Sequence, residues 1–253
     1  MNAVAVAVIV AACVMAGALF GLRLRRYLPD SHLTQNTQDT IKLGTNMVSV
    51  LTSLVLGLLI TTAKGSSDTI EQDIRGYAAD LILLDATLRD FGADAAVPRQ
   101  LLRSYTARTL QDIWPSSGNR ATSLDDTSAG ALLVQVRQAI RTLSPADTPQ
   151  RWLQEQALQT TTSLQRQRWQ IIEHSGSSVR PLIIIVVVCW IVAIFISFGL
   201  NANRNATVTA VFLVCSISIG GAVFLVLEID SPFHGLLRIS GAPMLGALAY
   251  MDR

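Results

Sequence analysis

Four long runs of apolar residues dominate the hydrophobic pattern of the chain. They cover residues 3–22, 43–63, 181–200 and 207–227. A helix needs about 20 apolar residues to cross the roughly 30 Å hydrocarbon core of a bilayer, because each residue adds about 1.5 Å. All four runs reach that length. The pattern therefore predicts four transmembrane helices in two hairpins, at residues 3–63 and 181–227.

The segment between the hairpins, residues 64–180, has the pattern of amphipathic helices. Apolar residues recur there at steps of three and four, which gives each helix one apolar face. No strand-like alternation stands out. We expect an all-α fold in which the two hairpins flank a helical extramembrane domain. The second membrane helix should continue into this domain as one long helix that ends at Gly92.

Polar side chains gather on one face of the second apolar run. The members of this face are Thr45, Asn46, Ser49, Thr52 and Ser53. Polar groups are unfavourable in lipid unless they have partners, so this face should avoid the bilayer. Two interpretations remain open. The face packs against other helices, which small residues permit, or it lines a water-filled pore.

A second candidate site follows the fourth apolar run. Its residues form a membrane-proximal turn, with Glu228, Asp230, Pro232, Phe233 and Gly235. One interpretation is an ordinary charged helix end at the membrane surface. The other is a turn that binds a cation or caps a helix of another subunit, since carboxylates and carbonyls suit hard cations.

The C-terminal segment, residues 228–253, is too apolar for a free tail. Glycine and proline interrupt it, so it cannot span the membrane. We expect an interfacial segment that lies along the membrane surface, or one that packs onto the helical domain.

The distribution of charge bears on topology and partners. Arg23, Arg25 and Arg26 directly follow the first apolar run, and no basic residue precedes it. This order is typical of a retained membrane helix and not of a cleaved signal peptide. The positive-inside rule then places the N-terminus and residues 64–180 outside the membrane. The net charge of +2, without a basic stripe, argues against a nucleic-acid partner.

Candidate chemistry is sparse. The chain has no Walker loop, no dinucleotide fingerprint and no metal-binding histidine or cysteine motif. Its three cysteines lie in apolar runs, and its three histidines lie in separate segments. We expect no enzyme activity, no catalytic residues, no cofactor and no metal. No charged residue lies inside a span, which argues against a proton pump or a voltage sensor.

The order of these features resembles the bestrophin-like family of bacterial membrane proteins, a domain of unknown function distantly related to bestrophin anion channels. Three pieces carry the resemblance over nearly the whole chain. They are the arginines after the first helix, the segment LLRSYTARTLQDIWP at residues 101–115, and DSPFHG at residues 230–235. The chain departs from true bestrophins in having no aromatic residue at 43–63 and no acidic calcium clasp beyond Asp230.

The resemblance implies a homo-oligomer, specifically a pentamer, in a bacterial inner membrane. The second membrane helix of each subunit would line a central anion pore, with the polar face at residues 45–53 toward it. Bestrophins hold their helical domain in the cytoplasm, whereas the charge pattern here places it outside. We expect an oligomeric, anion-channel-like protein whose partners are the lipid bilayer and a small anion. The alternative is a non-conducting membrane scaffold whose helical domain binds a protein partner.

Overall fold

The computed structural model of the chain describes residues 2–25, 27, 35–114, 127–174, 176, 181–233 and 237–252. Helices make up nearly all of these residues, and the described part of the chain contains no β-strand. The predicted all-α fold class is therefore confirmed. The internal contacts divide the chain into two compact units. Unit 1 comprises Met1–Gly65 and Ser177–Ser231, and unit 2 comprises Ser66–Gly176 and Pro232–Arg253.

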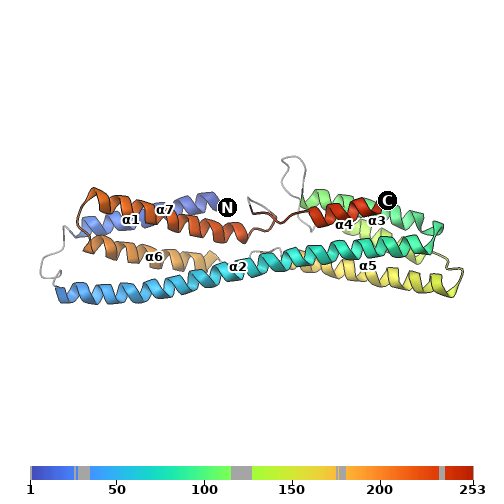
Figure 1. Cartoon of the computed structure of the whole chain (residues 1–253), viewed down its shortest axis with the longest axis horizontal. Coiled ribbons are helices and arrows are strands. Elements are labelled where there is room, and N and C mark those ends of the chain that lie inside the picture. Colours follow the sequence, from blue (N-terminus) through green and yellow to red (C-terminus); the bar gives the residue numbers. More distant parts are fainter. Residues whose placement is uncertain are drawn as a thin grey trace. The chain divides into compact units, whose positions relative to one another are not determined.

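Unit 1 holds the apolar helices. It contains α1 (Ala3–Leu24), the first part of α2 (Gln35–Phe91), α6 (Pro181–Asn201) and α7 (Ala206–Ile229), shown in Figure 1. Each of these helices is long and apolar enough to cross a membrane and contains one of the predicted spans. The chain is accordingly a multi-pass membrane protein. The pairing of its spans into hairpins and the outside location of its N-terminus stay predictions.

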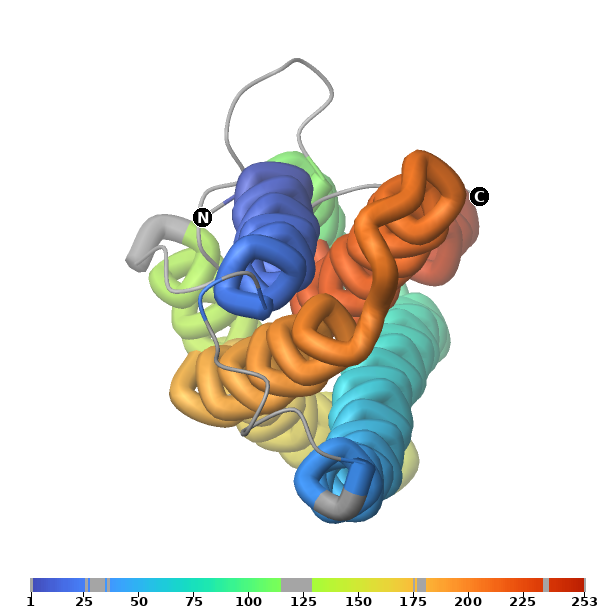
Figure 2. The backbone as a smooth tube through the Cα atoms, turned by 90° about the vertical axis from the view of Figure 1, so that its left-hand side faces the viewer, coloured from blue at the N-terminus to red at the C-terminus, as the bar shows by residue number. Residues whose placement is uncertain are grey.

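Close backbone approach at glycines holds unit 1 together. Helix α1 packs against both α6 and α7, as the view along these helices in Figure 2 shows. A Cβ atom added at Gly21 would lie 2.2 Å from the backbone oxygen of Ile196, and one added at Gly199 would lie 2.3 Å from that of Ala18. At Gly220 the distance to the backbone oxygen of Ala7 would be 2.8 Å. Only glycine permits such contacts, which are typical of helix packing in membranes.

Large apolar side chains cover the outside of unit 1. Exposed examples occur on all four of its helices, among them Val8, Leu54, Ile185 and Leu213. A soluble protein rarely leaves so many large apolar residues in contact with water. Lipid tails solvate them well, so this surface fits the hydrocarbon core of a bilayer.

Helix α2 is continuous from Gln35 to Phe91 and contributes to both units. It ends because Gly92 adopts a φ of 112°, a conformation that residues with a side chain rarely accept. The sequence predicted one long helix ending at Gly92, and that prediction is confirmed. A short 3-10 turn, η2 (Ala93–Ala95), then leads into the next helix.

Unit 2 is a helical bundle around a core of large apolar residues. Its elements are the second part of α2, η2, α3 (Ala96–Ile113), α4 (Thr127–Arg141), α5 (Thr148–His174) and α8 (Ala242–Met251). Fully buried core residues include Leu81, Leu84, Leu102, Ile140 and Leu164. Asp147 stabilises the start of α5, because its carboxylate accepts a hydrogen bond of 2.8 Å from the backbone N–H of Gln150.

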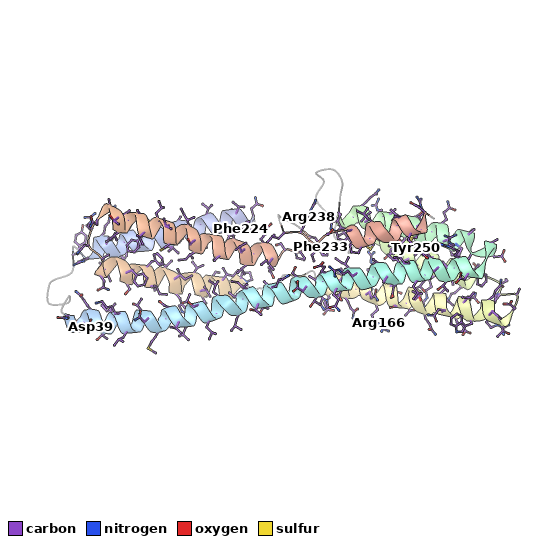
Figure 3. All side chains as sticks on the ribbon, viewed as in Figure 1. Asp39, Arg166, Phe224, Phe233, Arg238 and Tyr250 are labelled. Atoms are coloured by element: carbon purple, nitrogen blue, oxygen red, sulfur yellow. The ribbon has the colours of Figure 1, made fainter. Side chains whose placement is uncertain are left out.

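The C-terminal segment packs into unit 2. Met244, Ala247 and Met251 of α8 are buried in its core, and α8 contacts α3. The guanidinium of Arg89 on α2 lies 5.1 Å from the ring centroid of Tyr250, which is labelled in Figure 3. Packing onto the helical domain was one of the two arrangements that the sequence left open. An additional contact of this segment with the bilayer stays a prediction.

Candidate functional site

Within unit 1, α2 has an inner face that packs and an outer face that the described residues do not cover. Thr52, Leu59 and Ala63 are buried, and the last two belong to the apolar cluster of the unit. The outer face carries exposed large apolar residues, including Leu43, Met47, Val50, Leu54 and Leu58. One side of this span is therefore available to lipid or to another protein chain.

Three of the five predicted polar residues satisfy their hydroxyl groups inside the unit. The hydroxyl oxygens of Thr45 and Ser197 on α6 lie 2.7 Å apart and share a hydrogen bond. Ser49 donates to the carbonyl oxygen of Thr45 at 2.8 Å, and Thr52 donates to that of Val48 at 2.7 Å. Thr45 and Thr52 therefore fit the interpretation that the polar face packs against other helices of the unit.

The other two predicted residues, Asn46 and Ser53, are exposed, and their side chains have no hydrogen-bond partner among the described residues. They share a face of α2 with three more exposed residues. At successive steps of four and seven residues this face reads Lys42, Asn46, Ser53, Gly57 and Lys64. Such steps return to one side of an α-helix. We call these five residues the α2 stripe.

A lysine stands at each end of the α2 stripe, and the positions between them are uncharged. Lys42 forms an ion pair with Asp39 on the same helix, with 3.6 Å between Nζ and Oδ1. Both side chains are 58% exposed, so solvent screens this pair and it holds the lysine only weakly. The sequence already carries this pattern, because Lys42 and Lys64 lie at helical steps of four and seven residues from Asn46 and Gly57.

A cavity of about 450 Å³ lies within unit 1, between the start of α2, the end of α6 and the start of α7. Its polar side includes Lys42, Asn46 and Asn201. Its apolar side includes the rings of Phe198 and Phe212. We call this cavity the groove. Its residues come from three helices far apart in the sequence, so no pattern along the chain could have predicted it.

The predicted membrane-proximal turn is divided between the two units. Glu228 is buried at the end of α7, and Asp230 follows that helix, with its backbone N–H bonded to the carbonyl oxygen of Val226 at 3.1 Å. Pro232 and Phe233 belong to unit 2. Gly235 lies outside the described residues, as does Arg26 of the arginine cluster. Among the described residues, no group of three potential ligands could hold a metal ion.

Phe233 contacts Trp114, the tryptophan of the Trp-Pro pair. Their rings meet edge to face, with 6.1 Å between centroids and 79° between planes. The indole N–H of Trp114 donates to the carbonyl oxygen of Ile239 at 2.9 Å, and the N–H of Ile239 donates to that of Pro232 at 2.8 Å. The structure thus brings together two sequence segments that are far apart in the chain. Among the described residues, these contacts hold the two segments together.

Unit 2 also contains a buried carboxylate, Asp85, which is 1% exposed on its side chain. It accepts hydrogen bonds from Nε and Nη2 of Arg99 at 2.9 and 3.3 Å and from Nη2 of Arg89 at 3.0 Å. The hydrogen bond to Asp85 raises the pKa of the Arg99 guanidinium above its ordinary value. Both carboxylate oxygens are occupied, so the cluster ties α2 to α3 and has no free group for acid–base catalysis.

Comparison with known protein families gives a match that covers most of the chain. A family model described as a bestrophin-like domain matches residues 9–244. No curated protein and no solved structure matches the chain. The matched range includes the whole α2 stripe, the groove, Trp114 and Phe233, and it extends over most of the chain. The protein belongs to the bestrophin-like family.

Proposed function

We propose that the protein is a homo-oligomeric anion channel in which the α2 stripe of each subunit faces a central pore. The observation that carries this proposal is an exposed, uncharged polar row with a lysine at each end. Membership of the bestrophin-like family supports it, because the resemblance implies a pentamer with the second membrane helix around the pore.

The chemistry of the α2 stripe suits anions. In an oligomer, Lys42 and Lys64 would form a cationic ring at each mouth and raise the local concentration of anions. Between the rings, the amide of Asn46 and the hydroxyl of Ser53 can donate hydrogen bonds to a passing anion. No carboxylate lies between residues 42 and 64 to repel it.

The neighbouring outer face of α2 supports oligomer formation. Met47, Val50 and Leu54 are exposed beside the α2 stripe. Association of several α2 helices would cover these residues and turn the polar row toward a shared axis. Thr45 and Thr52, whose hydroxyls are bonded inside the unit, would then stabilise the subunit without lining the pore.

Current recordings from the purified full-length protein in planar bilayers test the proposal. Ser53→Leu should reduce anion conductance severalfold, because it replaces a hydrogen-bond donor by a bulky apolar group. Lys64→Glu should shift the reversal potential in a salt gradient toward cation permeation, because it inverts one ring of charge. Thr52→Val, which removes a hydroxyl of similar size on the inner face, is the matched control and should leave the current unchanged.

If well-folded wild-type oligomer gives no current in the bilayer, the proposal of an anion channel is contradicted. That result would favour a non-conducting membrane scaffold. An effect of Thr52→Val as large as that of Ser53→Leu would contradict the assignment of the α2 stripe.

A further inference from the structure

The groove has the two kinds of wall that an amphiphilic ligand needs. Phe198 and Phe212 provide an apolar side, and Lys42 and Asn46 provide a polar side next to it. Its volume of about 450 Å³ lies within the usual range of ligand pockets, roughly 300–1,000 Å³. The groove can therefore hold an apolar chain and a polar group at the same time.

The groove lies at the ends of the spans. Lys42 immediately precedes the apolar run of α2, Asn201 is the last residue of α6, and Thr207 stands in the first turn of α7. In a bilayer these positions lie where hydrocarbon gives way to lipid headgroups. A ligand that enters from the membrane would place its chain toward Phe212 and its headgroup toward Lys42.

The charge around the groove is positive. Lys42 has an ammonium group that keeps donors beyond its weak pair with Asp39. Arg25 reaches the α6–α7 connection, where Nη1 donates to the carbonyl oxygen of Ala202 at 2.7 Å, and Ala202 lines the groove. The amide of Asn46 has no partner among the described residues. These groups complement a phosphate.

We propose that the groove binds an anionic phospholipid of the surrounding bilayer, with the headgroup phosphate at Lys42 and Asn46 and the start of one acyl chain between Phe198 and Phe212. Binding does not depend on conduction. Since Lys42 and Asn46 also belong to the α2 stripe, a bound headgroup would add negative charge at one pore mouth and lower anion conductance. That consequence alone rests on the proposed function.

Native mass spectrometry of the full-length protein, titrated with phosphatidylglycerol or with phosphatidylcholine of the same acyl chains, tests the proposal. The wild-type protein should retain phosphatidylglycerol in preference to phosphatidylcholine. Lys42→Gln should weaken phosphatidylglycerol binding about tenfold, the usual effect of losing one charge-assisted hydrogen bond. Val211→Trp should abolish binding, because Val211 lines the groove and the larger ring fills it.

Two matched controls keep the outcome decisive. Lys64→Gln removes a positive charge at the other end of the same span, and Val214→Trp adds a ring at an exposed position of α7 outside the groove. Both should bind phosphatidylglycerol as the wild type does. Equal retention of the two lipids, no retention by the wild type, or unchanged binding in Lys42→Gln and Val211→Trp would overturn the proposal. A loss of binding in the controls equal to that in the groove variants would also overturn it.

Discussion

Units 1 and 2 are both built from helices, yet different forces hold them together. In unit 2, large side chains such as Leu84 and Leu102 fill a core from which solvent is excluded. In unit 1, backbones approach each other at Gly21, Gly199 and Gly220, and many large apolar residues face outward. The difference follows from the solvent. Water drives apolar side chains inward, whereas lipid gives them no such drive, so close packing must hold the helices together.

The treatment of polar groups differs in the same way. Unit 2 buries the charge of Asp85 because two arginines bond it from both sides. In the described part of unit 1, the central stretches of the spans contain hydroxyls and glycines in place of ion pairs, and several hydroxyls bond to carbonyls of their own helix. A helix in lipid can satisfy a hydroxyl locally, but an ion pair there is costly to bury.

The largest effect should come from Asp85→Ala in unit 2. This change leaves two guanidiniums without their carboxylate. Breaking a buried ion pair usually lowers the free energy of unfolding by about 3–5 kcal/mol. Because both arginines are partly exposed and can be hydrated, we expect a loss of about 3 kcal/mol here. Denaturant unfolding of the full-length protein in detergent measures it. Asp90→Ala, at an exposed position of the same helix, is the control. Equal losses of unfolding free energy in both variants would show that the burial of Asp85 does not cause the destabilisation.

A smaller loss should follow from Gly199→Ala in unit 1. The new Cβ would meet the backbone oxygen of Ala18 at 2.3 Å, and a backbone cannot move aside as a flexible side chain can. We expect a destabilisation of about 1–3 kcal/mol, as for other overpacked sites. Gly221→Ala provides the matched control, since its Cβ would have no neighbour within 4 Å. If Gly199→Ala unfolds at the same denaturant concentration as the control, close approach does not hold α1 to α6.

The smallest effect, and one of opposite sign, should come from Ser216→Ala in α7. The Ser216 hydroxyl is buried and has no hydrogen-bond partner among the described residues. Removing an unsatisfied polar group should stabilise the protein by up to about 1 kcal/mol. Ser218→Ala, whose exposed hydroxyl donates to the carbonyl oxygen of Val214, should change the stability little. A clear destabilisation by Ser216→Ala would mean that this hydroxyl has a partner in the assembled protein.

The sequence predicted the helices well because their cause is local. Apolar length defines the spans, and Gly92 ends α2 through its own backbone conformation. The candidate site depends on what lies beside each helix, which is not a local property. One residue turns a helix by about 100°, so Thr45 bonds to α6 while Asn46 is exposed. Nothing in the pattern at residues 45–53 indicates where α6 lies.

Asp85 in unit 2 also has a partner that the local sequence pattern does not identify. Its position among Leu81, Leu84 and Leu88 places an acid on an apolar helix face, which indicates a buried pair. The partner Arg99 comes from another helix, and only the folded chain identifies it.

The bond between Arg25 and Ala202 has a consequence for the order in which the protein is built. Arg25 directly follows α1, but the residue that carries its acceptor is synthesised 177 residues later, just after α6. At typical rates of synthesis this delay lasts roughly 10–35 s. Gly17 and Gly21 of α1 likewise meet their close neighbours, Val192 and Ile196, only after α6 has been synthesised. During that interval nascent α1 must remain in the membrane without these contacts, held by its own hydrophobic length.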